Sequence, residues 1–174
     1  MDLTNPPAIN RAKLPLTIAP GHVAWVHQNA GVAGRFGSYS HGIERAIARV
    51  LLEHDLLRER CRAEGVRFDA KVFAGVLRED LEATRPGAAG RPPKAEARSS
   101  TRERADATVA VDLVARARDE LVDKGPFEAM NQVVEVGLRL LQAEAAGSPA
   151  HPNPEAAWSR YRQEAATLGI TKRR

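Results

Sequence analysis

The sequence predicts a mainly α-helical protein with one short two-stranded antiparallel β-ribbon, formed by two strand-helix-helix units in one chain that pair as a pseudo-dimer. Apolar and polar residues alternate in two short runs, residues 13–20 and 107–111, as they do in half-buried strands. Each run precedes two segments whose apolar residues recur every three or four positions, as in amphipathic helices. Because a lone strand has nothing to pair with, the two runs are expected to pair with each other or with a second copy of the chain.

The alternation divides the side chains of both strands between two faces, because strand side chains point alternately up and down. The residues expected on the buried face are Leu14, Leu16, Ile18, Val109 and Val111. The residues expected on the outward face are Lys13, Pro15, Thr17, Ala19, Thr108 and Ala110. Pro15 has no N–H to donate, which confines it to a position where the ladder needs no donor.

The second unit continues with two predicted helices. Asp112 is the expected N-cap of a helix over residues 113–124, since its carboxylate can accept hydrogen bonds from first-turn amides. Gly125 ends that helix, and Pro126 is expected to open the next, because a first helical turn tolerates the missing N–H. The expected buried residues of the last helix, which reaches about residue 143, are Met130, Val133, Val134, Gly137, Leu138 and Leu141.

The first unit has the same order. A helix is predicted over residues 21–30, followed by a loop at 31–37. Ser38 and Ser40 then stand at the start of a long helix, where small hydroxyl residues cap the free amides. The apolar stripe of this helix is expected to comprise Ile43, Ala46, Ile47, Val50, Leu51 and Leu56.

Changes in composition divide the chain into six segments. A helical connector is expected between the units because residues 69–83 have a strong apolar stripe, and a linker follows because Pro, Gly, Ala and Arg dominate without periodicity. The expected segments are a flexible arm (1–12), the first unit (13–57), the helical connector (58–84), a basic flexible linker (85–105), the second unit (106–145) and a tail with a short helix (146–174).

Composition narrows the class of protein. The single cysteine, Cys61, excludes an internal disulfide framework and a cysteine-rich zinc site, and it suits a reducing compartment such as the cytoplasm. The first residues do not resemble a signal peptide, and no stretch is long and apolar enough to span a membrane, so a soluble protein without membrane partners is expected. The aromatic content of only 5% predicts a core built from Ala, Val and Leu.

Positive charge is concentrated between Arg85 and Arg104, where the excess of basic over acidic residues equals the net charge of +4 of the whole chain. Such a cluster favours a polyanion as partner, although a solvated linker explains it equally well. Within it, Arg91 and Lys94 belong to a Gly-Arg-Pro-Pro-Lys sequence that resembles the core of an AT-hook, which lies in the minor groove of A·T-rich DNA. A plain linker is the competing interpretation.

No catalytic, metal-binding or cofactor-binding pattern is found, so an enzyme is not expected. His22 and His27 lack the i, i+4 spacing that places two ligands on one helix face, and Cys61 has no histidine context. The glycine-rich loop at residues 31–37 follows a helix and lacks the lysine of a phosphate-binding loop.

The motifs resemble a known DNA-binding family. The run from Thr108 to Asp112, the turn glycine Gly125 and the later Val-Gly-Leu at 136–138 look like a ribbon-helix-helix unit of the Arc, MetJ and CopG kind. The sequence Gly-Ser-Tyr-Ser at 37–40 is similar to the opening of the second helix in that family. The resemblance implies that the paired strands enter the major groove of double-stranded DNA.

The resemblance also implies roles for individual residues. The candidates for base reading are Lys13, Thr17, Thr108 and Ala110, and the candidates for phosphate binding are Ser38, Tyr39, Ser40 and Arg104. The second unit departs from the pattern, because its helix is expected to open at Pro126 without a serine and with Glu128, which would repel a phosphate. The two units are therefore not expected to read DNA equivalently, and the second is expected to serve mainly as a structural partner.

The family and the tandem arrangement suggest a plasmid or conjugative-transfer accessory protein or a transcriptional regulator, with a relaxase, a partition ATPase or a toxin as a protein partner. Whether the chain is a monomeric pseudo-dimer or a homodimer stays open. The alternative is an antitoxin-like or scaffold protein that acts mainly through protein-protein contacts, using the helix at 69–83 and the segment around Trp158.

Overall fold

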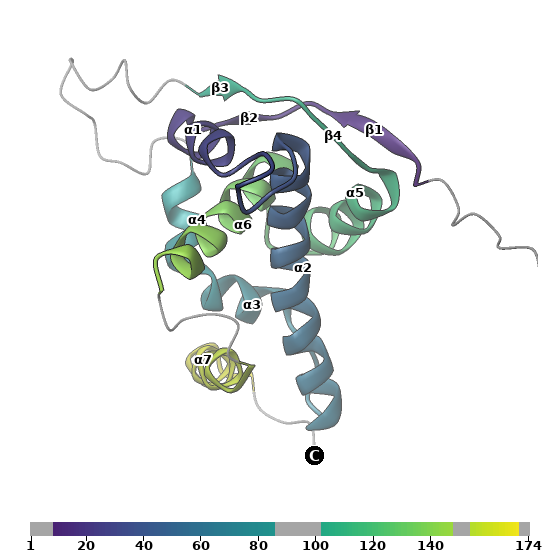
Figure 1. The fold of residues 1–174 in the computed structure, drawn as a ribbon. Coiled ribbons are helices and arrows are strands. Elements are labelled where there is room, and N and C mark those ends of the chain that lie inside the picture. Colours follow the sequence, from purple (N-terminus) through teal and green to yellow (C-terminus); the bar gives the residue numbers. More distant parts are fainter. Residues whose placement is uncertain (1–8, 86–101, 148–153, 171–174) are drawn as a thin grey trace, which may run out of the picture.

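The computed structural model describes residues 9–85, 102–147 and 154–170. It is mainly helical, with a two-stranded antiparallel ribbon that lies across one end of the helical body (Figure 1). The basic linker from 86 to 101, which includes the AT-hook-like sequence with Arg91 and Lys94, and residues 1–8 of the predicted arm lie outside the described residues.

The ribbon forms within one chain. Strand β1 (Arg11–Leu14) pairs with β4 (Ala107–Ala110), and strand β2 (Thr17–Ile18) pairs with β3 (Glu103–Arg104), both antiparallel. The two ladders keep one register and are joined by a hydrogen bond from the Ala105 amide to the Leu16 carbonyl oxygen at 2.9 Å. The interruption falls at Pro15, which has no N–H to donate. The predicted pairing of the two runs is thereby confirmed.

Two predicted boundaries of the ribbon were wrong. Arg11 and Ala12, placed in the flexible arm, belong to β1, and Glu103 with Arg104, placed in the basic linker, forms β3. Arg11-Ala12 continues the polar-apolar alternation of the first run, but both residues were grouped with the Pro- and Asn-containing start of the chain. Glu103 and Arg104 are both polar and were grouped with the Arg-rich linker. Cross-strand hydrogen bonding extends the ribbon to them.

The helices of the first half follow the prediction closely. Helix α1 (Pro20–Gln28) leads through a loop to the long helix α2 (Tyr39–Ala63). Ser38 is the N-cap of α2, and its hydroxyl oxygen accepts a hydrogen bond from the His41 amide at 3.1 Å. Helix α2 continues past the predicted end of the first unit, which brings Cys61 into the core.

The third predicted helix differs in its start and its form. Helix α5 (Val111–Ala117) begins directly after β4, so Val111 is 39% exposed instead of lying on the buried strand face, and Asp112 is inside the first turn instead of capping it. The chain then continues as a π-helical segment, η1 (Arg118–Asp123). The Val111 amide donates to the Asn10 carbonyl oxygen at 2.9 Å, where the ribbon ends. This amide therefore has an acceptor although Val111 is the first residue of the helix.

Helix α6 (Met130–Ala145) does not begin at Pro126 as predicted. The Phe127 amide donates to the Leu121 carbonyl oxygen at 3.1 Å, and the Phe127 side chain is 3% exposed. Burial of this ring therefore turns residues 126–129 into an irregular segment before the helix starts. Of the residues predicted to be buried, Leu141 is only partly buried, and the others are confirmed: Met130, Val133, Val134, Gly137 and Leu138.

Helices α2 and α6 cross at the centre of the body, beneath the ribbon (Figure 1). A Cβ atom at Gly137 would overlap the backbone carbonyl of Ala46, which is itself fully buried. The two helices are therefore in backbone contact at this point, and only glycine fits at position 137.

The connector and the tail cover the end of the body away from the ribbon (Figure 1). The single helix predicted at 69–83 is two short helices, α3 (Ala70–Val76) and α4 (Arg78–Thr84), which break at Leu77 so that α3 packs on α7 and α4 on α6. Helix α7 (Pro154–Thr167) confirms the short helix predicted in the tail. Its Trp158 and Tyr161 are buried against the body.

Candidate nucleic-acid interface

The ribbon has one covered and one open face. Helices α1, α2, α5 and α6 all lie on the same side of it (Figure 1). The side chains turned toward these helices are buried: Leu14, Leu16, Ile18, Ala105, Ala107 and Val109. Lys13, Thr17 and Thr108 are exposed on the opposite face, as the alternation predicts.

Register brings the polar residues of the open face together in pairs. Lys13 lies directly opposite Thr108, and Thr17 lies directly opposite Arg104. In each pair a cationic side chain faces a threonine. The cation of the first pair is on β1, and the cation of the second pair is on β3. Ala110, the fourth candidate for base reading, lies at the end of the ribbon opposite Arg11 and is half-buried.

Asp106 lies between these pairs, opposite Pro15, and binds both cations of the open face. The Arg104 Nε donates to Asp106 Oδ1 and Oδ2 at 3.2 and 3.0 Å, and Arg104 Nη2 is 2.9 Å from Oδ2. Lys13 Nζ is also 2.9 Å from Oδ2. The hydrogen bond from Arg104, followed by that from Lys13, lowers the pKa of Asp106 to about 2. Arg104 was predicted to bind phosphate. It lies instead on the open face of the ribbon, beside the candidates for base reading.

The N-terminus of α2 is attached to the ribbon. The Ser40 hydroxyl oxygen accepts a hydrogen bond from the Thr108 amide at 3.0 Å. One turn later, Glu44 Oε1 accepts from the Ala110 amide at 2.7 Å, and Glu44 Oε2 forms an ion pair with Arg11 at 3.0 Å. These contacts satisfy amides of β4 that face away from β1, and they hold the strand on the helix.

Tyr39, another predicted phosphate contact, is engaged inside the protein. Its ring stacks on His27 with 4.6 Å between the ring centroids, and its hydroxyl donates to the Ala105 carbonyl oxygen at 3.5 Å. Burial, with the nearby carboxylates of Glu103 and Asp106, raises the pKa of Tyr39 to about 12. Its hydroxyl therefore stays protonated and remains a donor.

Helix α6 holds the other strand with an equivalent set of contacts. Asn131 Oδ1 accepts from the Thr17 amide at 3.2 Å, and Glu135 Oε1 accepts from the Ala19 amide at 2.8 Å. Arg102 donates to the Thr17 carbonyl oxygen at 3.1 Å and pairs with Glu135 at 2.9 Å. Thr108 is held in the same way in the other half. There, Arg11 Nη1 donates to the Thr108 carbonyl oxygen at 3.1 Å.

The two sets of contacts are separated by the same number of residues along the chain. The corresponding residues are Arg11 and Arg102, Lys13 and Arg104, Thr17 and Thr108, Ser40 and Asn131, and Glu44 and Glu135. The same interval relates the buried rings of Phe36 and Phe127. It also relates Ala46 to Gly137, the residues at which α2 and α6 meet.

Sequence reasoning missed five of these residues, which are Arg11, Glu44, Arg102, Asn131 and Glu135. The repeated Gly-x-Phe at positions 34–36 and 125–127 would have aligned the halves correctly and matched Asn131 with Ser40. Aligning the halves on the expected helix start at Pro126 concealed this match.

One cluster of possible metal ligands occurs among the described residues. His54, Asp55 and Glu120 bring ligand atoms within 4.8 Å of one another. Arg116, however, forms ion pairs with both carboxylates, and burial lowers the pKa of His54, which favours its neutral form. The two acids are thus already neutralised by a cation from the protein.

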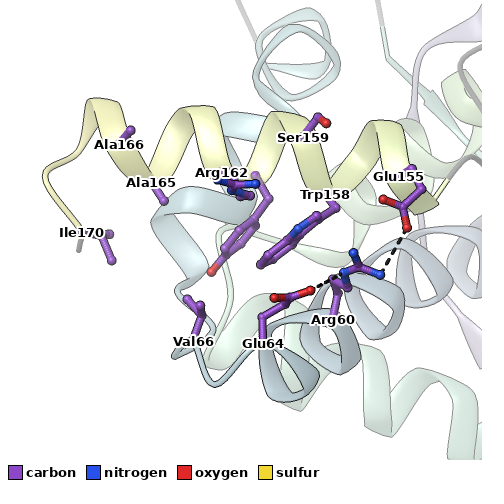
Figure 2. Close-up of a pocket in the computed structure, with 11 residues that line it drawn as sticks. Arg60, Glu64, Val66, Glu155, Trp158, Ser159, Arg162, Ala165, Ala166 and Ile170 are labelled. Carbon is purple, nitrogen blue, oxygen red and sulfur yellow. Dashed lines mark ion pairs between the residues drawn. The ribbon is translucent and has the colours of Figure 1, made fainter. Parts of the chain in front are cut away.

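An open pocket of about 510 Å³ lies between the end of α2 and α7 (Figure 2). Arg60 pairs with Glu64 at 3.3 Å and with Glu155 at 3.2 Å, and its guanidinium lies 5.7 Å from the centre of the Trp158 ring. These charges bind one another along the lining of the pocket.

Comparisons with known proteins leave the family open: neither family models, curated sequences nor solved structures match this chain. Within the described ranges, no helix combines the length and the apolar character needed to cross a membrane.

Proposed function

We propose that this chain binds double-stranded DNA by inserting the open face of its ribbon into the major groove. In this proposal residues 11–57 and 102–145 are two ribbon-helix-helix units fused in one chain, and they pair as a pseudo-dimer. The observation that carries the proposal is the matched attachment of the two strands, Thr108 to Ser40 of α2 and Thr17 to Asn131 of α6. Equal spacing of the two sets supports a duplicated unit.

The shape and chemistry of the ribbon support DNA as the ligand. The major groove admits a two-stranded ribbon, and the helices of the described residues all lie on one face of this ribbon. On the open face, threonine hydroxyls can donate to or accept from base edges, and lysine or arginine can donate to guanine acceptors. The side chains of Lys13 and Arg104 are 66% and 75% exposed, so both can reach a ligand.

Phosphates fit at the N-terminus of α2, beside the ribbon. The first-turn amides of Tyr39 and Ser40 point out of this end of the helix, where the helix dipole favours an anion. Helix α6 starts next to the other strand, with Ala129 as its N-cap in place of a serine. Phosphate contacts would then come from both helix starts, with a stronger site at α2.

The biological process follows from the proposed architecture alone. Two fused units with unlike base-reading residues suit an imperfect palindrome, as an accessory protein of plasmid maintenance or conjugative transfer, or a transcriptional regulator, would require. Action mainly through protein-protein contacts has less support. Leu77 and Leu81 of the connector, and Trp158 of the tail, are buried in the body and do not form an exposed apolar surface.

The test is a binding assay with a library of randomised duplexes, followed by anisotropy titrations at several salt concentrations. We expect one enriched sequence and an affinity that falls steeply as salt rises, because phosphate contacts release counterions. Lys13→Ala combined with Thr17→Ala should weaken the sequence preference. Lys71→Ala, which removes an exposed lysine from α3, is the matched control and should change neither quantity.

Two results decide the proposal. Absence of binding to any duplex at low salt would exclude it. Light scattering on the complex then tests the pseudo-dimer: one chain per DNA site is expected from pairing within the chain, and an obligate pair of chains would contradict it.

A further inference from the structure

Arg104 and Asp106 form a side-on pair on the open face of the ribbon. Nε and Nη2 of the guanidinium both bind the Asp106 carboxylate, at 3.0 and 2.9 Å from Oδ2. These two nitrogens form one edge of the planar group. The other edge, formed by Nη1 and the second hydrogen of Nη2, consequently points away from the carboxylate.

The orientation of that second edge matters for recognition. Two parallel N–H donors match the O6 and N7 acceptors that guanine presents in the major groove. An unrestrained arginine on a surface has many rotamers and can bind any phosphate within reach, so it adds affinity with little discrimination. An arginine held by a neighbouring carboxylate has fewer rotamers to lose when it binds a base.

Lys13 occupies the corresponding place in the other half, and it binds the same carboxylate oxygen through a single nitrogen. An ammonium group is a point charge with three rotatable donors and has no planar edge to be oriented. Asp106 therefore neutralises part of the charge of both residues but orients the donors of only one. Its counterpart in the first strand is Pro15, so this half has no carboxylate of its own.

We propose that Asp106 is a positioning residue that makes Arg104 a guanine reader, so that the half of the target facing Arg104 is read more strictly than the half facing Lys13. This inference rests on the proposed function, since it concerns how the ribbon reads DNA. It also assigns Arg104 to a base edge instead of a phosphate.

The experiment is selection from a randomised duplex library with the full chain, comparing wild type with Arg104→Lys, Asp106→Ala and Asp106→Asn. We expect wild type to require guanine at one position of the site. Arg104→Lys keeps the charge and should lose that requirement, with discrimination against other bases falling about tenfold or more. Asp106→Ala should lose much of the guanine requirement while binding as tightly as wild type or more tightly, because a negative charge has been removed from the face that meets DNA.

Asp106→Asn should give intermediate discrimination, because its amide oxygen can still accept a hydrogen bond from Arg104. The matched control is Glu64→Ala, which removes an exposed carboxylate that pairs with Arg60 at the end of α2 away from the ribbon and should leave discrimination unchanged. Thermal melting of each variant verifies folding.

The inference is overturned if Asp106→Ala retains the full guanine requirement, if Arg104→Lys retains it, or if a folded Asp106→Ala no longer binds DNA. Failure of the proposed function looks different: wild type itself would then select no duplex. A wild-type site without any required guanine would leave DNA binding intact and exclude the guanine reader.

Discussion

The hydroxyl oxygen of Ser40 accepts a hydrogen bond from the amide of Thr108 at 3.0 Å, which joins the first turn of α2 to a strand from the other half of the chain. Asn131 of α6 makes the corresponding contact with Thr17. Each central helix thus holds the strand contributed by the opposite half. The position of the open face depends on both attachments.

Ser40→Ala should remove one of these attachments. The Thr108 amide loses its acceptor and turns to water, so we expect the free energy of unfolding to fall by about 1 kcal/mol. Urea denaturation followed by circular dichroism measures this change. Ser159→Ala, at an exposed site on α7, is the matched control and should be close to neutral. Equal effects of both variants would show that the hydroxyl of Ser40 does not hold the ribbon.

Gly137→Ala should destabilise the protein although alanine is the better helix former. Alanine alone favours a helix by about 1 kcal/mol over glycine, but here its methyl group would overlap the Ala46 carbonyl. Separating α2 from α6 should cost about 1–3 kcal/mol or more, measured as a lower melting temperature. Gly21→Ala in α1, where a Cβ meets no atom within 4 Å, should be neutral or stabilising. A stabilised Gly137→Ala variant would contradict the close crossing.

Glu135→Ala should be more damaging than the same change at its counterpart, Glu44. The Glu135 side chain is 2% exposed and binds both Arg102 and the Ala19 amide, so its loss leaves Arg102 without its counter-ion and the Ala19 amide without its acceptor. We expect a loss of about 3 kcal/mol. The Glu44 side chain is 13% exposed and its partner Arg11 is 44% exposed, so solvent compensates more and about 1 kcal/mol is expected. Chemical denaturation of the two variants compares them directly, and equal losses would contradict the difference in burial.

Asp106 should remain ionised to unusually low pH. Its pKa of about 2 lies below the ordinary value of 3.8 because of its bonds to Arg104 and then Lys13. A depressed pKa stabilises the folded protein above the unfolded pKa, and this contribution disappears as pH falls from about 4 through 2. NMR titration of the Asp106 side-chain carbon should therefore show a midpoint near 2. Arg104→Ala should raise it more than Lys13→Ala, and a wild-type midpoint near 3.8 would contradict the pairing.

The patterns within short stretches of the sequence predicted the features that depend only on residues close together in the chain. The alternation of Leu14, Leu16 and Ile18 located the first strand and its buried face, because side-chain direction in a strand has period two. Ser38 marked the start of α2, because a cap acts on amides within its own turn. The same reasoning placed Lys13, Thr17 and Thr108 on one exposed face.

The misplaced elements depend on contacts that are distant in sequence. The start of α6 moved to Met130 because the irregular segment before it buries Phe127, a contact that no helical period records. Arg104 joined the ribbon because Thr17 lies opposite it. Asn131 and Glu135 became attachments for the ribbon only once α6 had packed beneath it.

The sequence by itself determined the mainly helical class, the two strands and the polar composition of their open face, since each follows from local periodicity. Only the tertiary structure decided that the strands pair within one chain, that the two halves have equivalent attachments, and that Asp106 lies between Lys13 and Arg104. The physical reason is register. The antiparallel ladder determines which side chains of two distant segments face each other, and no pattern within either segment contains that information.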